Sequence, residues 1–324
     1  MTSADSWAAN IGPVRYNARL DAPSPPASHA QADVWTVGRL LEWTQAFFNR
    51  KQVDSPRLSA EMLLAHVLGV QRIKLYTSFD QPLSPTELAG FRDLVRRAGE
   101  QEPVRYLTGT APFYGLDFKV TPAVLIPRPD TETLVETALH HLRLSSDTGL
   151  EQPLRIADLC TGSGCIGLAL AKQLPGASVV ATELSDEAAE VARDNAELLG
   201  LSDRFEVRFG DLAEPLAGEP PFDLIVSNPP YIPTGDMAGL DRNVRDYEPH
   251  LALDGGDDGL DLIRRILRDV PRHLVPGGRL YLEMQFDQGP AASKLASEQG
   301  DWTDVQVLRD LGGRERVLTA RKQT

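Results

Sequence analysis

The spacing of apolar positions predicts a helical module near the start of the chain. From about residue 34 to residue 100, apolar side chains recur as they do on one face of a helix. Ser55 and Ser84 occupy N-cap positions, and a proline follows each of them, which marks the start of two further helices. The apolar face of the first helix is formed by Val37, Leu40, Leu41, Phe47 and Phe48. We therefore expect a small helical domain over residues 34–100.

After about residue 153 the pattern changes to short apolar runs that alternate with helical stretches. The runs that are long enough for one buried strand are "LRIADL", "SVVATEL", "RFEVRF", "FDLIVS" and "RLYLEM". Strands separated by helices are typical of an α/β fold whose mostly parallel sheet is covered on both faces. We expect this domain over residues 131–324. Residues 101–130, rich in aromatic residues, proline and glycine, predict a linker hairpin between the two domains.

Composition restricts the class of protein. The chain has 324 residues and a mean hydropathy of −0.24, it has no long apolar run, and its N-terminus lacks a signal pattern. We expect a cytoplasmic protein with no membrane partner. Residues 1–33, rich in proline, alanine and serine, predict a flexible extension. Cys160 and Cys165 are too few for a closed zinc site and too close for a disulfide framework, so we expect reduced thiols and no metal.

The charge of the chain bears on its partners. The formal net charge is −13, which opposes binding to a phosphate backbone. A protein or a small molecule is therefore the expected substrate, without direct contact to nucleic acid. The basic group Arg92, Arg96 and Arg97 keeps nucleic acid as an alternative, although a solvated helix face is the better explanation of these charges.

A glycine-punctuated turn follows the first strand of the α/β part. In "IADLCTGSGCIGLALAKQL", Gly162 and Gly164 would let the backbone approach a ligand at the carboxyl end of that strand. The spacing from Asp158 through Gly162 and Gly164 to Gly167 is not the strict dinucleotide pattern. A tight strand-to-helix turn without a ligand is the alternative interpretation.

Two acids at the tips of the next strands favour a bound nucleoside. Glu183 ends the second strand, where a carboxylate can accept hydrogen bonds from ribose hydroxyls, and Asp211 follows the third strand. A solvated acid before a helix is the alternative for Glu183. S-adenosyl-L-methionine fits this arrangement better than NAD, because it has no pyrophosphate and needs no strict phosphate loop.

The fourth strand ends in "SNPPYIP", which predicts a rigid turn at the same edge of the sheet. The Asn228 side-chain oxygen and the Pro229 carbonyl can accept both N–H bonds of a planar –NH2 group, and Tyr231 can pack on that group. Such a grip orients the nitrogen and stabilises the positive charge that grows during methyl transfer, so no separate general base is required. A rigid connector is the alternative, and the motif alone allows glutamine or adenine as the methyl acceptor.

Taken together, these residues resemble the HemK/PrmC family of protein-(glutamine-N5) methyltransferases, from about residue 36 to the C-terminus. The segments that carry the resemblance are "EPVRYLTGTAPFYGLDFKVTPAVLIPRPDTETLVE", "DLCTGSGCIGLALA", "SNPPYIP", "VRDYEPHLALDGGDDGLDLIRRIL", "LEMQFDQG" and "DLGGRERVL". The family implies a seven-stranded class I methyltransferase domain behind a small helical domain. It implies methyl transfer from S-adenosyl-L-methionine to the glutamine of the Gly-Gly-Gln tripeptide in class 1 peptide chain release factors.

The resemblance also assigns residues by matching motif. The expected catalytic residues are Asn228, Pro229 and Tyr231. The expected substrate-binding residues are Asn228, Pro229, Pro230, Tyr231 and Phe113, with residues 127–132 helping to wall the pocket. The expected cofactor-binding residues are Cys160, Thr161, Gly162, Ser163, Gly164, Glu183, Asp211, Leu212 and Asn228.

The sequence departs from the family pattern at four positions. Cys160 stands where glycine is usual, Glu183 where aspartate is common, Leu212 where an aromatic residue often flanks the adenine, and Gln285 where glycine is usual. Loss of stacking at Leu212 would weaken cofactor binding by about 0.5–1.5 kcal/mol. Methylation of a glutamine in a ribosomal protein, adenine-N6 methylation of nucleic acid and a non-catalytic scaffold are the competing hypotheses, and the intact Asn228 and Tyr231 argue against the last.

Overall fold

A computed structural model describes residues 34–145 and 153–324 of the chain. The elements described below all lie in the unit Thr36–Thr324. The flexible extension expected over residues 1–33 lies outside the described residues.

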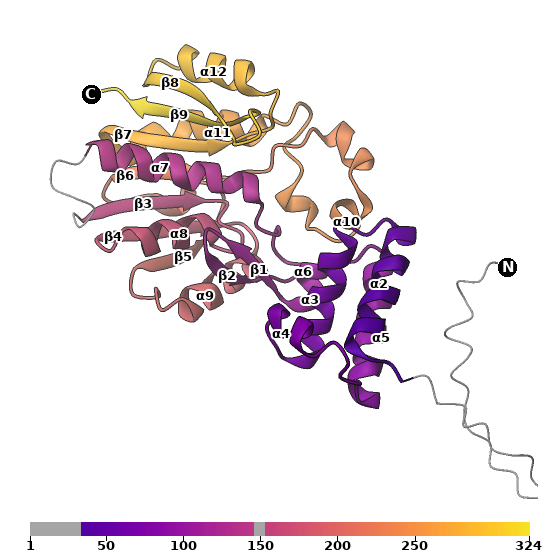
Figure 1. The fold of residues 1–324 in the computed structure, drawn as a ribbon. Coiled ribbons are helices and arrows are strands. Elements are labelled where there is room, and N and C mark those ends of the chain that lie inside the picture. Colours follow the sequence, from indigo (N-terminus) through magenta and orange to yellow (C-terminus); the bar gives the residue numbers. More distant parts are fainter. Residues whose placement is uncertain (1–33, 146–152) are drawn as a thin grey trace, which may run out of the picture. The chain divides into compact units, whose positions relative to one another are not determined.

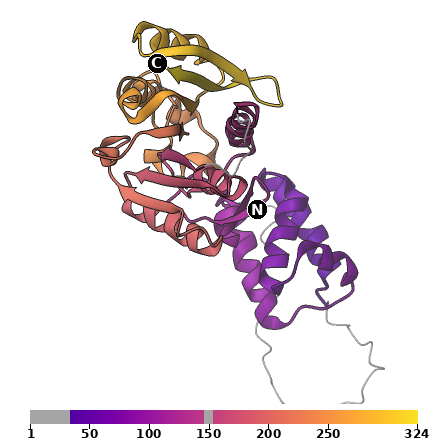
Figure 2. The same ribbon diagram turned by 90° about the vertical axis from the view of Figure 1, so that its left-hand side faces the viewer.

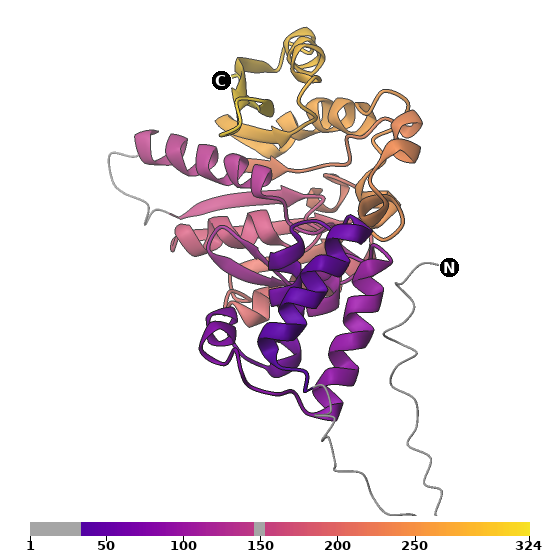
Figure 3. The same cartoon turned by 45° about the vertical axis from the view of Figure 1, so that its right-hand side comes forward.

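The first part of this unit is helical. Its helices are α2 (Val37–Lys51), α3 (Pro56–Leu68), α4 (Arg72–Thr77), α5 (Pro85–Gly99) and α6 (Val104–Thr108) (Figure 1). Helices α2, α3 and α5 pack side by side around buried apolar side chains such as Phe48, Leu64 and Phe91 (Figure 3). Ser84 forms a capping box with Glu87 at the start of α5. Ser55 precedes α3 as expected, but its side chain makes no capping hydrogen bond.

A short hairpin follows the helices. Strands β1 (Thr110–Phe113) and β2 (Leu116–Lys119) form an antiparallel two-stranded sheet. Tyr114 and Gly115 connect them with φ angles of 49° and 75°, as a two-residue turn that matches the twist of the strands requires. The hairpin is tied to a helix of the α/β part, because the backbone N–H of Lys119 donates to Oδ1 of Asn195 at 2.7 Å.

The α/β part is built on a seven-stranded sheet in the order β5-β4-β3-β6-β7-β9-β8. The strands are β3 (Leu154–Leu159), β4 (Ala177–Glu183), β5 (Phe205–Phe209), β6 (Phe222–Ser227), β7 (Leu274–Glu283), β8 (Trp302–Arg309) and β9 (Glu315–Lys322). All neighbours up to β7 are parallel, and β9 is antiparallel to both β7 and β8. This topology confirms the predicted seven-stranded class I methyltransferase fold.

Helices cover both faces of the sheet (Figure 2). One core includes side chains of α7 (Glu132–Ser145), α8 (Cys165–Gln173) and α9 (Asp186–Leu198), and the other includes side chains of α11 (Asp261–Asp269) and α12 (Gly289–Glu298). The strand order reverses on either side of β3, since β4 lies beside it on one side and β6 on the other. Ligands of open α/β sheets bind at the carboxyl ends of the strands at such a point.

The remaining elements are short. They are α10 (Arg242–Arg245) and the 3-10 turns η1 (Pro129–Thr131), η2 (Glu214–Leu216), η3 (Thr234–Gly239), η4 (His250–Ala252) and η5 (Val270–His273). In residues 34–145 and 153–324, no helix is both long and apolar enough to cross a membrane.

Candidate active site

The glycine-punctuated loop joins β3 to α8 in a backbone conformation that suits glycine. Gly162 and Gly164 have φ angles of 55° and 81°, and α8 begins directly after Gly164. The buried Asp158 fixes this loop, because its Oδ2 accepts hydrogen bonds from Oγ1 of Thr161 at 2.7 Å and from the backbone N–H of Gly167 at 3.0 Å. Burial raises the pKa of Asp158 to about 7.

A cavity of about 370 Å³ opens beside this loop, within the size range of small-molecule sites. The predicted cofactor residues that line it are Cys160, Thr161, Gly162, Ser163, Glu183, Asp211, Leu212 and Asn228. Gly164 does not line the cavity, and a Cβ at this position would lie 2.9 Å from the side chain of Leu168 and 3.2 Å from that of Phe205. The structure thus brings together side chains from the ends of four different strands.

Glu183 connects the tip of β4 to the glycine-punctuated loop. Its Oε2 accepts from the backbone N–H of Gly162 at 2.9 Å, and its Oε1 accepts from the N–H groups of Leu184 and Ser185 at 2.8 and 3.0 Å. A carboxylate has about four acceptor positions. Three are used here, so Glu183 keeps one acceptor for a ligand hydroxyl.

Asp211 and Leu212 lie at the tip of β5. One oxygen of Asp211 pairs with Nη2 of Arg265 on α11 at 2.7 Å. Leu212 is buried and has a φ of 49°. Its side chain gives the cavity an apolar wall, which suits a flat heterocycle although it provides no aromatic stacking.

Asn228 follows β6 and is held by the segment 127–132. Its Nδ2 donates to Oγ1 of the buried Thr131 at 3.3 Å. With the nitrogen turned to Thr131, Oδ1 of Asn228 is left to accept hydrogen bonds, and Asn228 lines the cavity.

The backbone after Asn228 is clamped by residues far away in the sequence. Nε2 of Gln288 donates to the carbonyl of Tyr231 at 2.9 Å and to that of Gly259 at 3.2 Å. A Cβ at Gly255 would lie 2.7 Å from Cα of Tyr231, so only glycine allows this approach. Gln285 donates its backbone N–H to Oε1 of Gln288 at 3.0 Å.

The Tyr231 side chain points to a carboxylate that the sequence did not single out. Its hydroxyl donates to Oε1 of Glu283 at 3.2 Å, and Glu283 is only 1% exposed at the end of β7. Burial raises the pKa of Glu283 to about 7, against the opposing effects of Thr131, Arg316 and Tyr231. Burial also raises the pKa of Tyr231.

Residues 127–132 reach several parts of the site. The contacts from this segment are Arg128 to Glu248 at 2.6 Å, Asp130 to Arg316 at 3.1 Å, Thr131 to Asn228 at 3.3 Å and Glu132 to the backbone N–H of Tyr114 at 2.8 Å. Burial raises the pKa of Glu248, while Arg128 favours its charged form. Arg128 is the only lysine or arginine among the described residues that line the cavity.

The other predicted substrate residues differ in whether they line the cavity. Pro230 lines the cavity, whereas Pro229 and Tyr231 do not. Phe113 is 1% exposed and packs edge to face on Phe118, with ring centroids 6.1 Å apart. The substrate roles of Pro229, Pro230, Tyr231 and Phe113 remain predictions.

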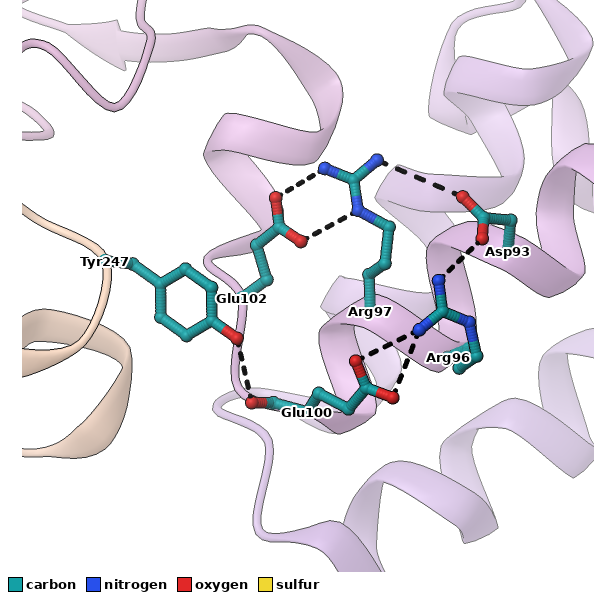
Figure 4. Close-up of polar contacts among 6 residues, drawn as sticks. All are labelled: Asp93, Arg96, Arg97, Glu100, Glu102 and Tyr247. Atoms are coloured by element: carbon teal, nitrogen blue, oxygen red, sulfur yellow. Dashed lines mark hydrogen bonds and ion pairs between the residues drawn. The ribbon is translucent and has the colours of Figure 1, made fainter.

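Two arginines of the basic group on α5, Arg96 and Arg97, are paired with acidic residues of the helical part and of the segment that follows it (Figure 4). Arg96 pairs with Asp93 at 2.9 Å and with Glu100 at 3.1 Å, and Nε of Arg97 donates to Glu102 at 2.8 Å. Neither arginine therefore offers an uncompensated charge to a phosphate backbone. Tyr247 directly precedes Glu248 in the sequence, and its hydroxyl donates to the carbonyl of Glu100 at 3.1 Å.

Comparison with known proteins extends these observations. The family model "PrmC N-terminal domain" matches residues 39–109, and "Methyltransferase small domain" matches residues 138–241. "Release factor glutamine methyltransferase" of Geobacter sulfurreducens is 46% identical over 289 residues, which is 89% of this chain and 98% of that protein. The chain belongs to the release factor glutamine methyltransferase family. The predicted family, the enzyme class and the use of S-adenosyl-L-methionine are thereby confirmed.

Other relatives agree with this family. The protein of the same name from Rhodopirellula baltica is 43% identical, and the match covers 89% of this chain and 97% of that protein. A solved protein-(glutamine-N5) methyltransferase (release factor-specific) from Alicyclobacillus acidocaldarius is 31% identical, with a TM-score of 0.40, and covers 64% of this chain and 100% of that chain. The sequence relatives, and not this superposition, carry the assignment.

Proposed function

We propose that the protein transfers a methyl group from S-adenosyl-L-methionine to the side-chain amide nitrogen, N5, of the glutamine in the Gly-Gly-Gln motif of class 1 peptide chain release factors. The observation that carries this proposal is the side chain of Asn228. It lines the cavity with its nitrogen bound to Thr131, so that its oxygen is free to accept from an incoming amide. The family relatives, whose names state release factor glutamine methylation, support the same substrate.

The residues of the cavity fit the cofactor. The remaining acceptor position of Glu183 suits a ribose hydroxyl, and the wall at Asp211 and Leu212 suits the adenine. Arg128, which Glu248 orients, suits the carboxylate of the amino-acid end. When bound, S-adenosyl-L-methionine supplies an electrophilic methyl group on a sulfonium.

The Asn-Pro turn would bind and orient the glutamine amide that accepts the methyl group. Oδ1 of Asn228 and the carbonyl of Pro229 would accept the two N–H bonds of the glutamine amide, while Tyr231 would border the planar group. This grip holds the nitrogen in one orientation and stabilises its developing positive charge. The nitrogen becomes strongly acidic as it is alkylated, so the proposal assigns no general base.

We propose the helical part, residues 34–100, as the substrate-recognition domain, with residues 101–130 as the linker and residues 131–324 as the methyltransferase domain. We further propose action in the cytoplasm, with no direct contact to nucleic acid or membrane. The net charge of −13 and the neutralised Arg96 and Arg97 support the exclusion of nucleic acid.

A methyl-transfer assay tests the proposal. Purified protein should transfer labelled methyl from S-adenosyl-L-methionine to a bacterial class 1 release factor. A release factor whose Gly-Gly-Gln glutamine is changed to alanine should take up no label. Labelling of a ribosomal protein, DNA or RNA but not of the release factor would refute the proposed substrate.

A further inference from the structure

We propose that Glu283 is a positioning residue that determines which end of the Asn228 side-chain amide faces the substrate. The inference rests on the proposed function, because it concerns the same amide grip. It assigns a role to the glutamate of the "LEMQFDQG" segment, which lies 55 positions after Asn228 in the sequence.

The sheet brings Glu283 and Asn228 to the same edge. In the parallel pair β6 and β7, Ser227 lies opposite Leu282, so the next residues of the two strands are Asn228 and Glu283. Each of the two side chains makes a hydrogen bond to a hydroxyl group at this edge. Oε1 of Glu283 accepts from the hydroxyl of Tyr231 at 3.2 Å, and Oγ1 of Thr131 accepts from Nδ2 of Asn228 at 3.3 Å.

Thr131, which binds Asn228, is also placed to act on Glu283. Its hydroxyl favours the charged form of Glu283 and so holds the pKa of this carboxyl below the value that burial alone would give. At the same time, Oε2 of Glu283 is buried and has no hydrogen-bond partner at full bonding geometry within the described part of the chain. A small rotation of the Thr131 hydroxyl toward this oxygen would satisfy a buried acceptor, which is costly to leave unpaired.

The direction of a hydrogen bond between Thr131 and Glu283 follows from the chemistry of a carboxylate. An ionised carboxylate can only accept, so in this bond the Thr131 hydroxyl would be the donor. The oxygen of Thr131 is then an acceptor for Asn228, and the Asn228 nitrogen turns to it. Oδ1 of Asn228 consequently faces the cavity, as an acceptor for the substrate –NH2 must.

Hydrogen bonds in the opposite direction would prevent Asn228 from accepting a hydrogen bond from the substrate amide. If Glu283 were replaced by a group that can donate, Thr131 could accept from it and donate to Oδ1 of Asn228. The Asn228 amide would then turn its –NH2 toward the substrate –NH2, and two donors would face each other. The carboxylate therefore excludes this arrangement, which an amide at residue 283 would permit.

The charges around Glu283 leave it without a direct ion pair in the described residues. Arg316 on β9 pairs with Asp130 at 3.1 Å and with Asp310 at 3.3 Å. Arg316 and the hydroxyls of Thr131 and Tyr231 favour the charged form, whereas Asp130 opposes it, and the thiol of Cys165 on α8 also interacts with Glu283. Burial outweighs the favourable groups and raises the pKa of Glu283 to about 7.

This balance predicts a pH dependence of turnover. Protonated Glu283 can donate, so the direction of the hydrogen bonds is lost as pH falls through about 7. Turnover at saturating S-adenosyl-L-methionine should therefore decline on the acid side of about pH 7. Protonation of Asp158, which fixes the cofactor loop, would appear instead as a change in S-adenosyl-L-homocysteine affinity.

The test compares the Glu283→Gln variant with the wild-type protein, with a release factor as substrate, between pH 5.5 and 8.5. The measured quantities are kcat, KM and the affinity for S-adenosyl-L-homocysteine. We expect kcat to fall by at least about tenfold at pH 8 and the acid-side decline to disappear, with cofactor-product affinity within about twofold. Thr131→Val should behave like Glu283→Gln, and Thr131→Ser, which keeps the hydroxyl, should lose less. Glu61→Gln, which removes another buried glutamate that accepts from a tyrosine, should keep the acid-side decline.

The outcomes separate the two proposals. Wild-type protein that does not methylate the release factor would contradict the proposed function. Active wild type together with unchanged kcat and pH profile in Glu283→Gln would overturn the role of Glu283. If Glu283→Gln does not fold, wild-type kinetics in Thr131→Val would overturn it equally, and a tenfold loss in Thr131→Val with a retained acid-side decline would do the same.

Discussion

Cys160 has a backbone conformation that costs free energy for any residue other than glycine. Its φ is 56°, in the left-handed region where a Cβ approaches the following carbonyl. The residue lies directly after β3 and lines the cavity. The strain therefore sits at the point where the cofactor is expected.

A pair of substitutions isolates this strain. Cys160→Ala and Cys160→Gly both remove the thiol, but only alanine keeps the Cβ, so we expect the glycine variant to be more stable by about 1 kcal/mol. Unfolding in urea measures the difference in free energy. An alanine variant at least as stable as the glycine variant would show that the left-handed conformation carries no strain.

Asn228 is the residue on which the proposed chemistry depends most. Asn228→Ala removes one acceptor of the amide grip, and we expect kcat to fall by about 100-fold or more while S-adenosyl-L-homocysteine affinity changes little. Steady-state kinetics and calorimetry measure the two effects. Asn243→Ala, on α10, is the matched control, because that side chain bonds to Asp54 and does not line the cavity. Near-normal turnover in Asn228→Ala would show that the grip is assigned to the wrong residue.

At the scale of elements, the glycines before α11 fix the position of the Asn-Pro turn. Gly259 has a φ of 74°, and a Cβ on it would lie 2.2 Å from the carbonyl oxygen of Tyr231. Nε2 of Gln288 donates to the same carbonyl at 2.9 Å. The turn therefore has little freedom to move.

We expect Gly259→Ala to displace the turn and to reduce kcat by at least about tenfold, since small displacements of catalytic groups cost large factors in rate. Gly235→Ala is the control, because Gly235 lies in η3 and a Cβ there meets nothing within 4 Å. Kinetics of both variants with the release factor provide the measurement. Equal kcat values for the two would argue against the clamp.

The segment 127–132 contributes Arg128 to the cavity. If Arg128 holds the cofactor carboxylate, Arg128→Gln should weaken S-adenosyl-L-homocysteine binding by about tenfold or more. Binding of 5′-methylthioadenosine, which lacks the amino-acid end, should hardly change. Calorimetry with both ligands tests the assignment, and an equal loss for the two ligands would mean that Arg128 only supports the fold of the segment.

Local sequence patterns predicted the strands and loops of the site, but they did not predict the long-range side-chain contacts that hold these loops. The strand runs, the glycine-punctuated loop and the residues at the tips of β4, β5 and β6 follow from short-range periodicity and turn chemistry, and most of the predicted cofactor residues line one cavity. Glu283 gives no such signal, because its importance depends on burial beside Tyr231, 52 positions away in the sequence. The same holds for Glu248, which meets Arg128 across 120 positions.

For the whole molecule, the proposed activity and the folding stability favour opposite protonation states of a buried carboxylate. Asp158 and Glu283 are both fully buried, and burial raises the pKa of each to about 7. The proposed grip requires ionised Glu283, whereas burial favours the neutral form. The protein is thus expected to be most active at pH values where these groups reduce its stability.

This conflict predicts how stability varies with pH. Because the folded-state pKa of Glu283 lies above its ordinary value of 4.5, its favourable contribution is complete below that value and is lost as pH rises through about 7. The shift corresponds to at most about 3 kcal/mol. Glu283→Gln should therefore become more stable relative to wild type as pH rises from 5.5 to 8.5, as measured by urea unfolding. Glu61→Gln is the control, because the pKa of Glu61 is lowered and its difference from wild type should stay constant over this range. A constant difference for Glu283→Gln would contradict the raised pKa and, with it, the acid-side decline in turnover.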